Sequence, residues 1–107
     1  ERSYTTGVHI QSIDLAMQRY LSLPTSEGVI ITDVEKRSSG EKAGLKVGDV
    51  IIEVDGKKIN SAQDISRVID EGLHKVGDIV TLKIIRENNS IELQLILEEP
   101  KSQWWGF

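Results

Sequence analysis

Runs of alternating or β-branched apolar residues predict five β-strands along the chain. They cover residues 7–11, 29–34, 50–54, 79–85 and 91–97. The second run, from Val29 to Val34, is dominated by β-branched side chains, which favour a pleated and half-buried strand. The last run alternates apolar and polar positions, the period of a strand with one buried face. The pair Asp55-Gly56 after the third run is a strong hairpin signal.

The first of two helical patterns lies between the first two strands. Over residues 13–23 the apolar side chains recur at intervals of three and four, as on one face of an α-helix. Ser12 and Asp14 are both candidates for the N-cap, since short oxygen-bearing side chains accept the first amides of a helix. Pro24 predicts that the helix stops before it.

The second helical pattern begins at Ser61 and ends near Gly72. Ser61 and Asp64 have the spacing of a capping box, with Asp where Glu or Gln is more usual. A shorter helical turn, closed by a glycine, is predicted at residues 41–45 after a polar loop. Five strands and two helices in this order predict an α+β domain on a small antiparallel barrel or sandwich.

Composition limits the classes of partner. The chain has 107 residues, the size of one domain, a formal net charge of −4 and no cysteine. Nucleic acid is not expected as a partner, because phosphate binding needs a basic face. No apolar run reaches membrane-spanning length, so no span is expected in this fragment. Because the chain starts at Glu1 without Met, we interpret it as a piece of a longer protein.

Candidate catalytic chemistry is sparse. His9 and His74 are the only histidines, and no metal-ligand motif such as H-E-x-x-H surrounds them. Serine, histidine and aspartate are all present, so composition alone leaves a Ser-His-Asp triad open. However, no serine lies in a G-x-S-x-G turn. The sequence therefore predicts no catalytic residue, no metal and no cofactor, although part of an enzyme active site remains the alternative.

One segment carries a family resemblance. Residues 39–56 read SGEKAGLKVGDVIIEVDG and resemble the PDZ signature, a small-residue loop followed by A-G-L-x-x-G-D-x-I-x-x-V-[ND]-G. The resemblance covers roughly residues 5–98. Residues 46–51 are echoed by residues 75–80, and both place a Gly-Asp turn directly before a strand. We interpret this echo as shared turn chemistry and not as a repeat architecture.

The order of elements narrows the resemblance. A Gly-Val strand and a helix precede the signature, which resembles the permuted PDZ domains of HtrA/Deg-type serine proteases. In that family the carboxylate-binding loop reads aromatic or apolar, then apolar-Gly-apolar. The matching positions are Thr5, Thr6, Gly7 and Val8. Gly7 and Val8 fit the pattern, whereas Thr5 and Thr6 depart from it.

The resemblance implies a peptide-binding module. Backbone amides of the loop 5–8 would capture the C-terminal carboxylate of another polypeptide, since a glycine lets successive N–H groups converge on an anion. The peptide would add as a strand beside His9, Ile10 and Gln11. Its last side chain would enter a pocket that the helix also lines. The predicted pocket residues are Val8, Ile10, Ile65, Val68 and Ile69. From the pattern alone, the three helical residues are equally well explained as core.

The last residues form a second candidate ligand feature. Residues 101–107 follow Pro100 as a separate tail, and Trp104, Trp105, Gly106 and Phe107 close the chain. An apolar residue before a free carboxylate has the form of a PDZ ligand. We therefore predict a domain at residues 1–100 and a tail that docks in the groove of a neighbouring copy. The alternatives are docking in the groove of the same molecule and an incidental terminus.

The resemblance also implies context. The chain would be a non-catalytic part of a serine protease, a hydrolase of protein quality control, and would recruit substrate to the protease domain or regulate it. It would lie in the periplasm or cell envelope. Other envelope proteins with such domains, namely site-2-type metalloproteases, C-terminal processing proteases and secretion components, are the alternative parents.

Overall fold

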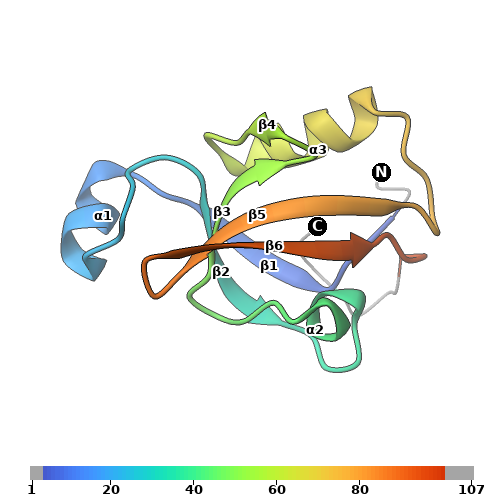
Figure 1. The fold of residues 1–107 in the computed structure, drawn as a ribbon, viewed down its shortest axis with the longest axis horizontal. Helices are drawn as coiled ribbons and strands as arrows, with labels where there is room; N and C mark the ends of the chain where they lie inside the picture. Colours follow the sequence, from blue (N-terminus) through green and yellow to red (C-terminus); the bar gives the residue numbers. More distant parts are fainter. Residues whose placement is uncertain (1–3, 101–107) are drawn as a thin grey trace.

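The computed structural model of the chain describes residues 4–100. Nine elements follow one another along it (Figure 1). They are β1 (Val8–Ser12), α1 (Leu15–Leu21), β2 (Val29–Val34), α2 (Ser39–Ala43), β3 (Val50–Val54), β4 (Lys57–Lys58), α3 (Ala62–Glu71), β5 (Ile79–Arg86) and β6 (Asn89–Ile96).

The strands form one antiparallel sheet with the order β1-β2-β3-β5-β6, and the short β4 pairs with β3. The sheet is not closed into a barrel, but an isolated bridge between Thr5 and Glu98 joins the segments at its two outer edges. The predicted α+β class and the antiparallel sheet are confirmed. The structure has six strands where about five were predicted, and three helices where two were predicted.

The additional elements are short and lie in segments that the sequence assigned to turns. β4 consists of two lysines that complete the hairpin after Asp55-Gly56. α2 begins earlier than the predicted turn at 41–45, because Ser38 is its N-cap and accepts a hydrogen bond from the Glu41 amide at 3.2 Å. Gly44 ends this helix in the left-handed region, as the sequence predicted.

Helix α1 projects from one end of the sheet (Figure 1). Its N-cap is Asp14, whose Oδ1 accepts from the Met17 amide at 2.7 Å, and its C-cap is Ser22. None of its residues is buried, and the Tyr20 side chain is 89% exposed. The helical pattern was therefore a correct predictor of the helix, but its apolar side chains do not pack into the core.

The core consists almost wholly of aliphatic side chains from the sheet and from α3. Its fully buried members include Ile31, Ile51, Ile59, Ile65, Ile69, Leu82, Ile84, Leu95 and Leu97. No helix within the described residues is long and apolar enough to cross a membrane. This core fixes α3 against the sheet and thereby sets the position of α3 relative to β1.

The start of α3 differs from the predicted capping box. Ser61 occupies the N-cap position, but its side chain makes no capping hydrogen bond. Instead, Ser12 at the end of β1 accepts a hydrogen bond from the Ala62 amide at 2.9 Å. Asp64 does reach back, but to the amide of Asn60 at 2.9 Å. The predicted capping role of Ser61 is therefore wrong, because the Ser12 side chain, 50 residues before Ala62 in the chain, accepts the hydrogen bond at the start of α3.

We expect Ser12→Ala to lower the free energy of unfolding by about 1 kcal/mol, the usual effect of losing a helix cap. The Ala62 amide would lose its acceptor, and the end of β1 would lose its link to α3. Urea unfolding of both proteins measures the difference. Ser61→Ala is the matched control and should have a smaller effect; the reverse order would contradict this assignment of the cap.

Candidate functional site

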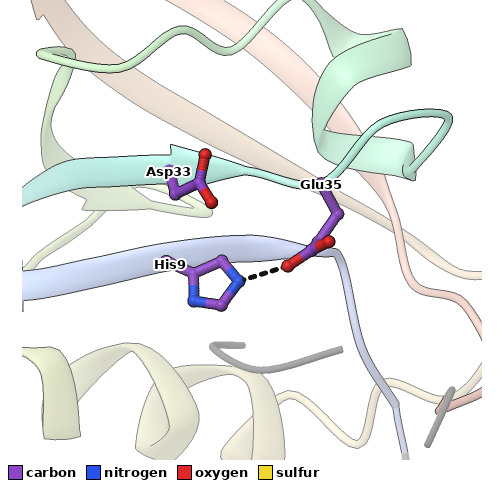
Figure 2. A group of neighbouring side chains, drawn as sticks. All are labelled: His9, Asp33 and Glu35. Carbon is purple, nitrogen blue, oxygen red and sulfur yellow. Dashed lines mark hydrogen bonds and ion pairs between the residues drawn. The ribbon is translucent and has the colours of Figure 1, made fainter. Parts of the chain in front are cut away.

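The edge of the sheet at β1 is the centre of the predicted site. Among residues 4–100, β1 pairs with β2 alone, and its ladder contains an irregularity between His9 and Ile10. α3 contacts β1 from the other side, and Figure 2 shows this pale yellow helix running alongside the strand. A strand edge without a partner strand is a template for an added strand.

The segment before β1 is buried and tightly anchored. Residues 5 and 98 exchange two backbone hydrogen bonds, from Thr5 N to Glu98 O at 2.7 Å and from Glu98 N to Thr5 O at 2.9 Å. The carbonyl of Thr6 accepts from the Gly40 amide at 3.0 Å, and that of Gly7 accepts from the Glu35 amide at 2.8 Å. Three successive carbonyls are thus bonded to the body of the domain.

Gly7 has a conformation and surroundings that require a glycine. Its φ is +75°, in the region that disfavours a side chain. A Cβ atom at this position would also lie 2.8 Å from the Ser38 Oγ and even closer to the Ser38 Cβ. The Gly7 amide makes one long contact, 3.4 Å, to the Thr5 Oγ1. That distance exceeds the 2.7–3.2 Å range of good N–H···O bonds, so the amide is weakly engaged.

The predicted groove residues fall on two adjacent elements. On β1, His9 and Ile10 are half-buried and Gln11 is exposed. On α3, Ile65, Val68 and Ile69 are all buried. Val8, Ile10 and these three residues belong to one continuous hydrophobic cluster. The tail residues Trp104, Trp105, Gly106 and Phe107 lie outside the described residues.

Both histidines are hydrogen-bonded to carboxylates. His9 Nε2 lies 2.6 Å from Glu35 Oε2, and His74 Nε2 lies 2.7 Å from Asp55 Oδ2. Among the described residues, neither histidine is hydrogen-bonded to a serine. Within residues 4–100 both half-buried imidazoles therefore have carboxylate partners, and neither makes the histidine–nucleophile contact of a hydrolytic triad.

The signature aspartate has a structural role. Asp49 is buried and accepts two hydrogen bonds from Arg86, Nε to Oδ1 at 2.9 Å and Nη2 to Oδ2 at 2.7 Å. Arg86 also donates to the Gly44 carbonyl at 2.8 Å. The hydrogen bond with Asp49 raises the pKa of the Arg86 guanidinium above its ordinary value. This bidentate pair fastens the turn before β3 to the end of β5.

A second charged pair stabilises the start of α3. The hydrogen bond from Arg67 lowers the pKa of Asp64, and the Asn60 amide lowers it further. The same bond raises the pKa of Arg67. Because the folded-state pKa of Asp64 is depressed, its contribution to stability is present above the unfolded pKa and is lost as the pH falls through the folded pKa.

Sequence reasoning missed the residues that hold the loop. Glu35 and Gly40 donate their amides to it, and a Cβ at Gly40 would collide with Val8. Glu98 pairs with Thr5 and also accepts from the Ser39 amide through its side chain at 2.9 Å. Only the small residues 39–40 left a signal in the sequence, because they belong to the small-residue loop of the signature.

Comparisons with known proteins agree with this geometry. A PDZ domain family profile matches residues 7–97. A probable periplasmic serine endoprotease DegP-like of Chlamydia trachomatis is 37% identical over 93 residues, 87% of this chain and 18% of the relative. Protease Do-like 8, chloroplastic, of Arabidopsis thaliana is 36% identical over 91 residues, 75% of this chain and 20% of the relative. The chain thus spans about a fifth of the length of these relatives.

Solved structures share the fold at lower identity. The HtrA3 PDZ domain bound to a phage-derived ligand, FGRWV, has a TM-score of 0.75 and 18% identity, covering 89% of this chain and 85% of that one. The HtrA-type protease AlgW with a decapeptide has a TM-score of 0.78 and 17% identity, covering 92% of this chain and 30% of that one. These likenesses confirm the predicted fold.

Proposed function

The chain belongs to the PDZ domain family, in the form found in HtrA/Do-type serine proteases, and from this premise we propose that it binds the C-terminal ends of other polypeptides. The observation that carries the proposal is the loop 5–8. Its carbonyls are bonded to the body of the domain, Gly7 has a positive φ, and the loop leads directly into an edge strand.

Capture of the peptide carboxylate is the first step of the proposed mechanism. The amides of Thr6, Gly7 and Val8 are our candidates for the donors, with Thr5 completing the loop. Gly7 supports this best, since a carboxylate oxygen is a stronger acceptor than the distant Thr5 hydroxyl. Peptide ends of any sequence would share this interaction, because every free C-terminus carries the carboxylate.

Strand addition and side-chain burial follow. The peptide would lie antiparallel beside His9, Ile10 and Gln11, where backbone hydrogen bonds supply affinity without sequence preference. Its last side chain would enter the apolar surroundings of Ile65, where burial favours an apolar residue. The same pocket is proposed to include Val8, Ile10, Val68 and Ile69. The HtrA3 PDZ domain was solved with a ligand that ends in valine, which supports this preference.

The tail is proposed to be a ligand of the same kind. Trp104, Trp105, Gly106 and Phe107 end in an apolar residue with a free carboxylate and carry two tryptophans upstream. The ligand of the HtrA3 PDZ domain also has a tryptophan next to its last residue. We infer that residues 101–107 dock in the groove of a second copy of the chain.

Fluorescence polarisation of a labelled peptide ending in WWGF tests these proposals. The protein is the chain without residues 101–107, which keeps every helix and strand that the structure describes. We expect micromolar binding of the free acid and at least ~10-fold weaker binding of the C-terminal amide, because one charged hydrogen-bonded contact is worth about 1.5–3 kcal/mol. The same peptide ending in aspartate is the control for the apolar pocket.

The outcomes separate the parts of the proposal. Equal binding of acid and amide would rule out carboxylate capture by the loop. Equal binding of the peptides ending in phenylalanine and aspartate would rule out the apolar pocket. If no WWGF peptide binds while another peptide with an apolar C-terminus does, the proposed peptide-binding groove is supported and the tail is not its ligand.

We propose that the domain recruits polypeptides to, or regulates, the protease domain of a serine protease in the periplasm or cell envelope. One relative is named periplasmic and another chloroplastic, which supports a compartment outside the cytoplasm. Proteolysis by the full-length parent, with and without a groove-binding peptide, tests the regulatory role. Cell fractionation tests the compartment; a cytoplasmic parent would contradict it.

A further inference from the structure

Three side chains that could ligate a metal ion lie together on β1, on β2 and on the residue that follows β2. They are His9, Asp33 and Glu35, and one ligand atom from each lies within 4.8 Å of the others (Figure 2). The His9 imidazole reaches the Glu35 carboxylate, with Nε2 2.6 Å from Oε2. The group was not predicted from the sequence, because His9 lies 24 and 26 positions before the two carboxylates and the three residues match no ligand motif.

The strand register brings the three residues together. His9 and Asp33 are direct partners in the antiparallel ladder, and such pairs have Cβ atoms about 4.5–5.5 Å apart. Glu35 lies two residues beyond Asp33 and so extends from the same side of the chain. The intervening Val34 and the preceding Val8 pack toward the core. The three polar side chains therefore occupy the face turned away from it.

The backbone under this group is fixed. The Glu35 amide donates to the Gly7 carbonyl at 2.8 Å, and the Glu35 carbonyl accepts from the Ser38 hydroxyl at 2.7 Å. Asp33 Oδ1 accepts from the Val34 amide at 2.9 Å, which orients the carboxylate. Ligands held in place before an ion arrives lose less freedom when it binds.

The charges of the group suit a cation. Within residues 4–100, neither Asp33 nor Glu35 forms an ion pair with a lysine or an arginine. With a neutral imidazole the three side chains carry two negative charges on partly shielded surface. The side chains of His9 and Glu35 are 23% and 27% exposed, so an ion could reach them from solvent.

We propose that His9, Asp33 and Glu35 bind a divalent transition-metal ion of the zinc class. One imidazole nitrogen with two carboxylate oxygens is a donor set that zinc accepts, whereas magnesium and calcium prefer oxygen alone. Bonds of about 2.0–2.2 Å to a tetrahedral ion place neighbouring ligand atoms about 3.3 Å apart. The three ligand atoms already lie within 4.8 Å of one another and would close to that spacing around the ion. Three protein ligands leave a coordination position for water or another donor.

Metal binding would replace the hydrogen bond between His9 and Glu35. The ion takes the place of any proton on His9 Nε2, and that proton leaves to solvent or is carried on Nδ1. Affinity should therefore fall as the solution is acidified, since protons compete for the same nitrogen. The metal would also cross-link β1 to the residue that holds the Gly7 carbonyl.

His74 provides a matched control within the chain. It too has two carboxylate neighbours, but Asp55 lies 2.7 Å from Nε2 and Asp78 lies 3.8 Å from Nδ1. The two carboxylates thus lie beside opposite nitrogens of the ring. An ion bound to either nitrogen would have only one of the two carboxylates next to it. His74→Gln should therefore leave metal affinity unchanged.

The test is calorimetric titration of the 107-residue chain with Zn²⁺ in a chelator-free buffer, with Mg²⁺ as the comparison ion. We expect one Zn²⁺ per chain, no detectable Mg²⁺ binding, and at least ~10-fold weaker Zn²⁺ binding for His9→Gln and for Glu35→Gln, at the lower end of the losses seen for altered metal sites. Imidazole NMR signals should show Zn²⁺ shifting His9 and not His74.

Two results would overturn the proposal. One is Zn²⁺ affinity that survives both His9→Gln and Glu35→Gln; the other is a loss of affinity in His74→Gln as large as theirs. Circular dichroism checks that each variant folds. If His9→Gln does not fold, Glu35→Gln and Asp33→Asn decide the question, because these carboxylates lie at the surface. None of these readouts uses a peptide, so failure here is distinct from failure of peptide binding.

Discussion

Gly7→Ala should weaken binding of peptide C-termini by about 100-fold or more, equivalent to about 2.7 kcal/mol. A side chain at a φ of +75° costs about 1–2 kcal/mol. The added methyl also meets Ser38, which cannot easily move. Its hydroxyl donates to the Glu35 carbonyl and accepts from the Glu41 amide. The loop must therefore shift, and its amides no longer converge. Fluorescence polarisation measures the loss.

Two variants isolate the cause of this loss. Gly48 also has a positive φ, 96°, but nothing lies within 4 Å of a Cβ there. Gly48→Ala should lose stability without losing peptide affinity. Combining Gly7→Ala with Ser38→Gly removes the colliding atoms and should restore part of the binding. If the Gly48 variant loses as much affinity as the Gly7 variant, general destabilisation is the reason and the loop assignment is wrong.

Asp49→Asn should lower the free energy of unfolding by about 2 kcal/mol, within the range for hydrogen bonds to charged groups, because Asp49 is buried whereas the Arg86 side chain is 26% exposed. The side-chain NH2 of asparagine is a donor, and the Arg86 guanidinium has donors only, so the two groups cannot form a hydrogen bond there. The guanidinium then keeps the Gly44 carbonyl but loses its countercharge. Urea unfolding of both proteins measures the change, provided that the slopes agree.

Asp78 is the matched control for Asp49. The two aspartates end the echoed turns, and each accepts the amide three residues before it, at 2.9 Å from Lys46 and at 3.0 Å from Lys75. Among residues 4–100 Asp78 has no arginine partner, and its side chain is 39% exposed. Asp78→Asn should therefore cost less than about 1 kcal/mol. Equal losses in the free energy of unfolding for the two variants would mean that the hydrogen bond within the turn, and not the ion pair with Arg86, stabilises the domain.

Much of the fold could be predicted because its signals are local. The strand from Val29 to Val34 and the turn at Asp55-Gly56 follow from residue type alone. The signature at residues 39–56 pointed to the family because its residue types meet local requirements. Most of its glycines adopt positive φ angles, and its buried Asp49 pairs with Arg86. Helix α1 was also predicted from spacing, although its apolar face remains exposed.

The remaining features depend on contacts between distant parts of the chain. Ser12 caps α3, and nothing near Ser12 in the sequence indicates that partner. The support of the loop by Gly40 and Glu98 depends on how α2 and β6 pack beside it. The group of His9, Asp33 and Glu35 exists only because the ladder of β1 and β2 has its particular register.

The bridge between Thr5 and Glu98 also determines how the domain responds to tension. The two segments are antiparallel, so the chain enters and leaves the fold side by side. A force applied through residues 4 and 99 therefore peels the bonds at 2.7 and 2.9 Å one after the other instead of shearing them together. We expect the anchor of the loop 5–8 to yield first, together with the buried Tyr4 side chain and before the strands separate, and single-molecule pulling from these positions tests this order. Tension in the residues that flank this bridge would then open the loop 5–8, and release of the tension would let it close.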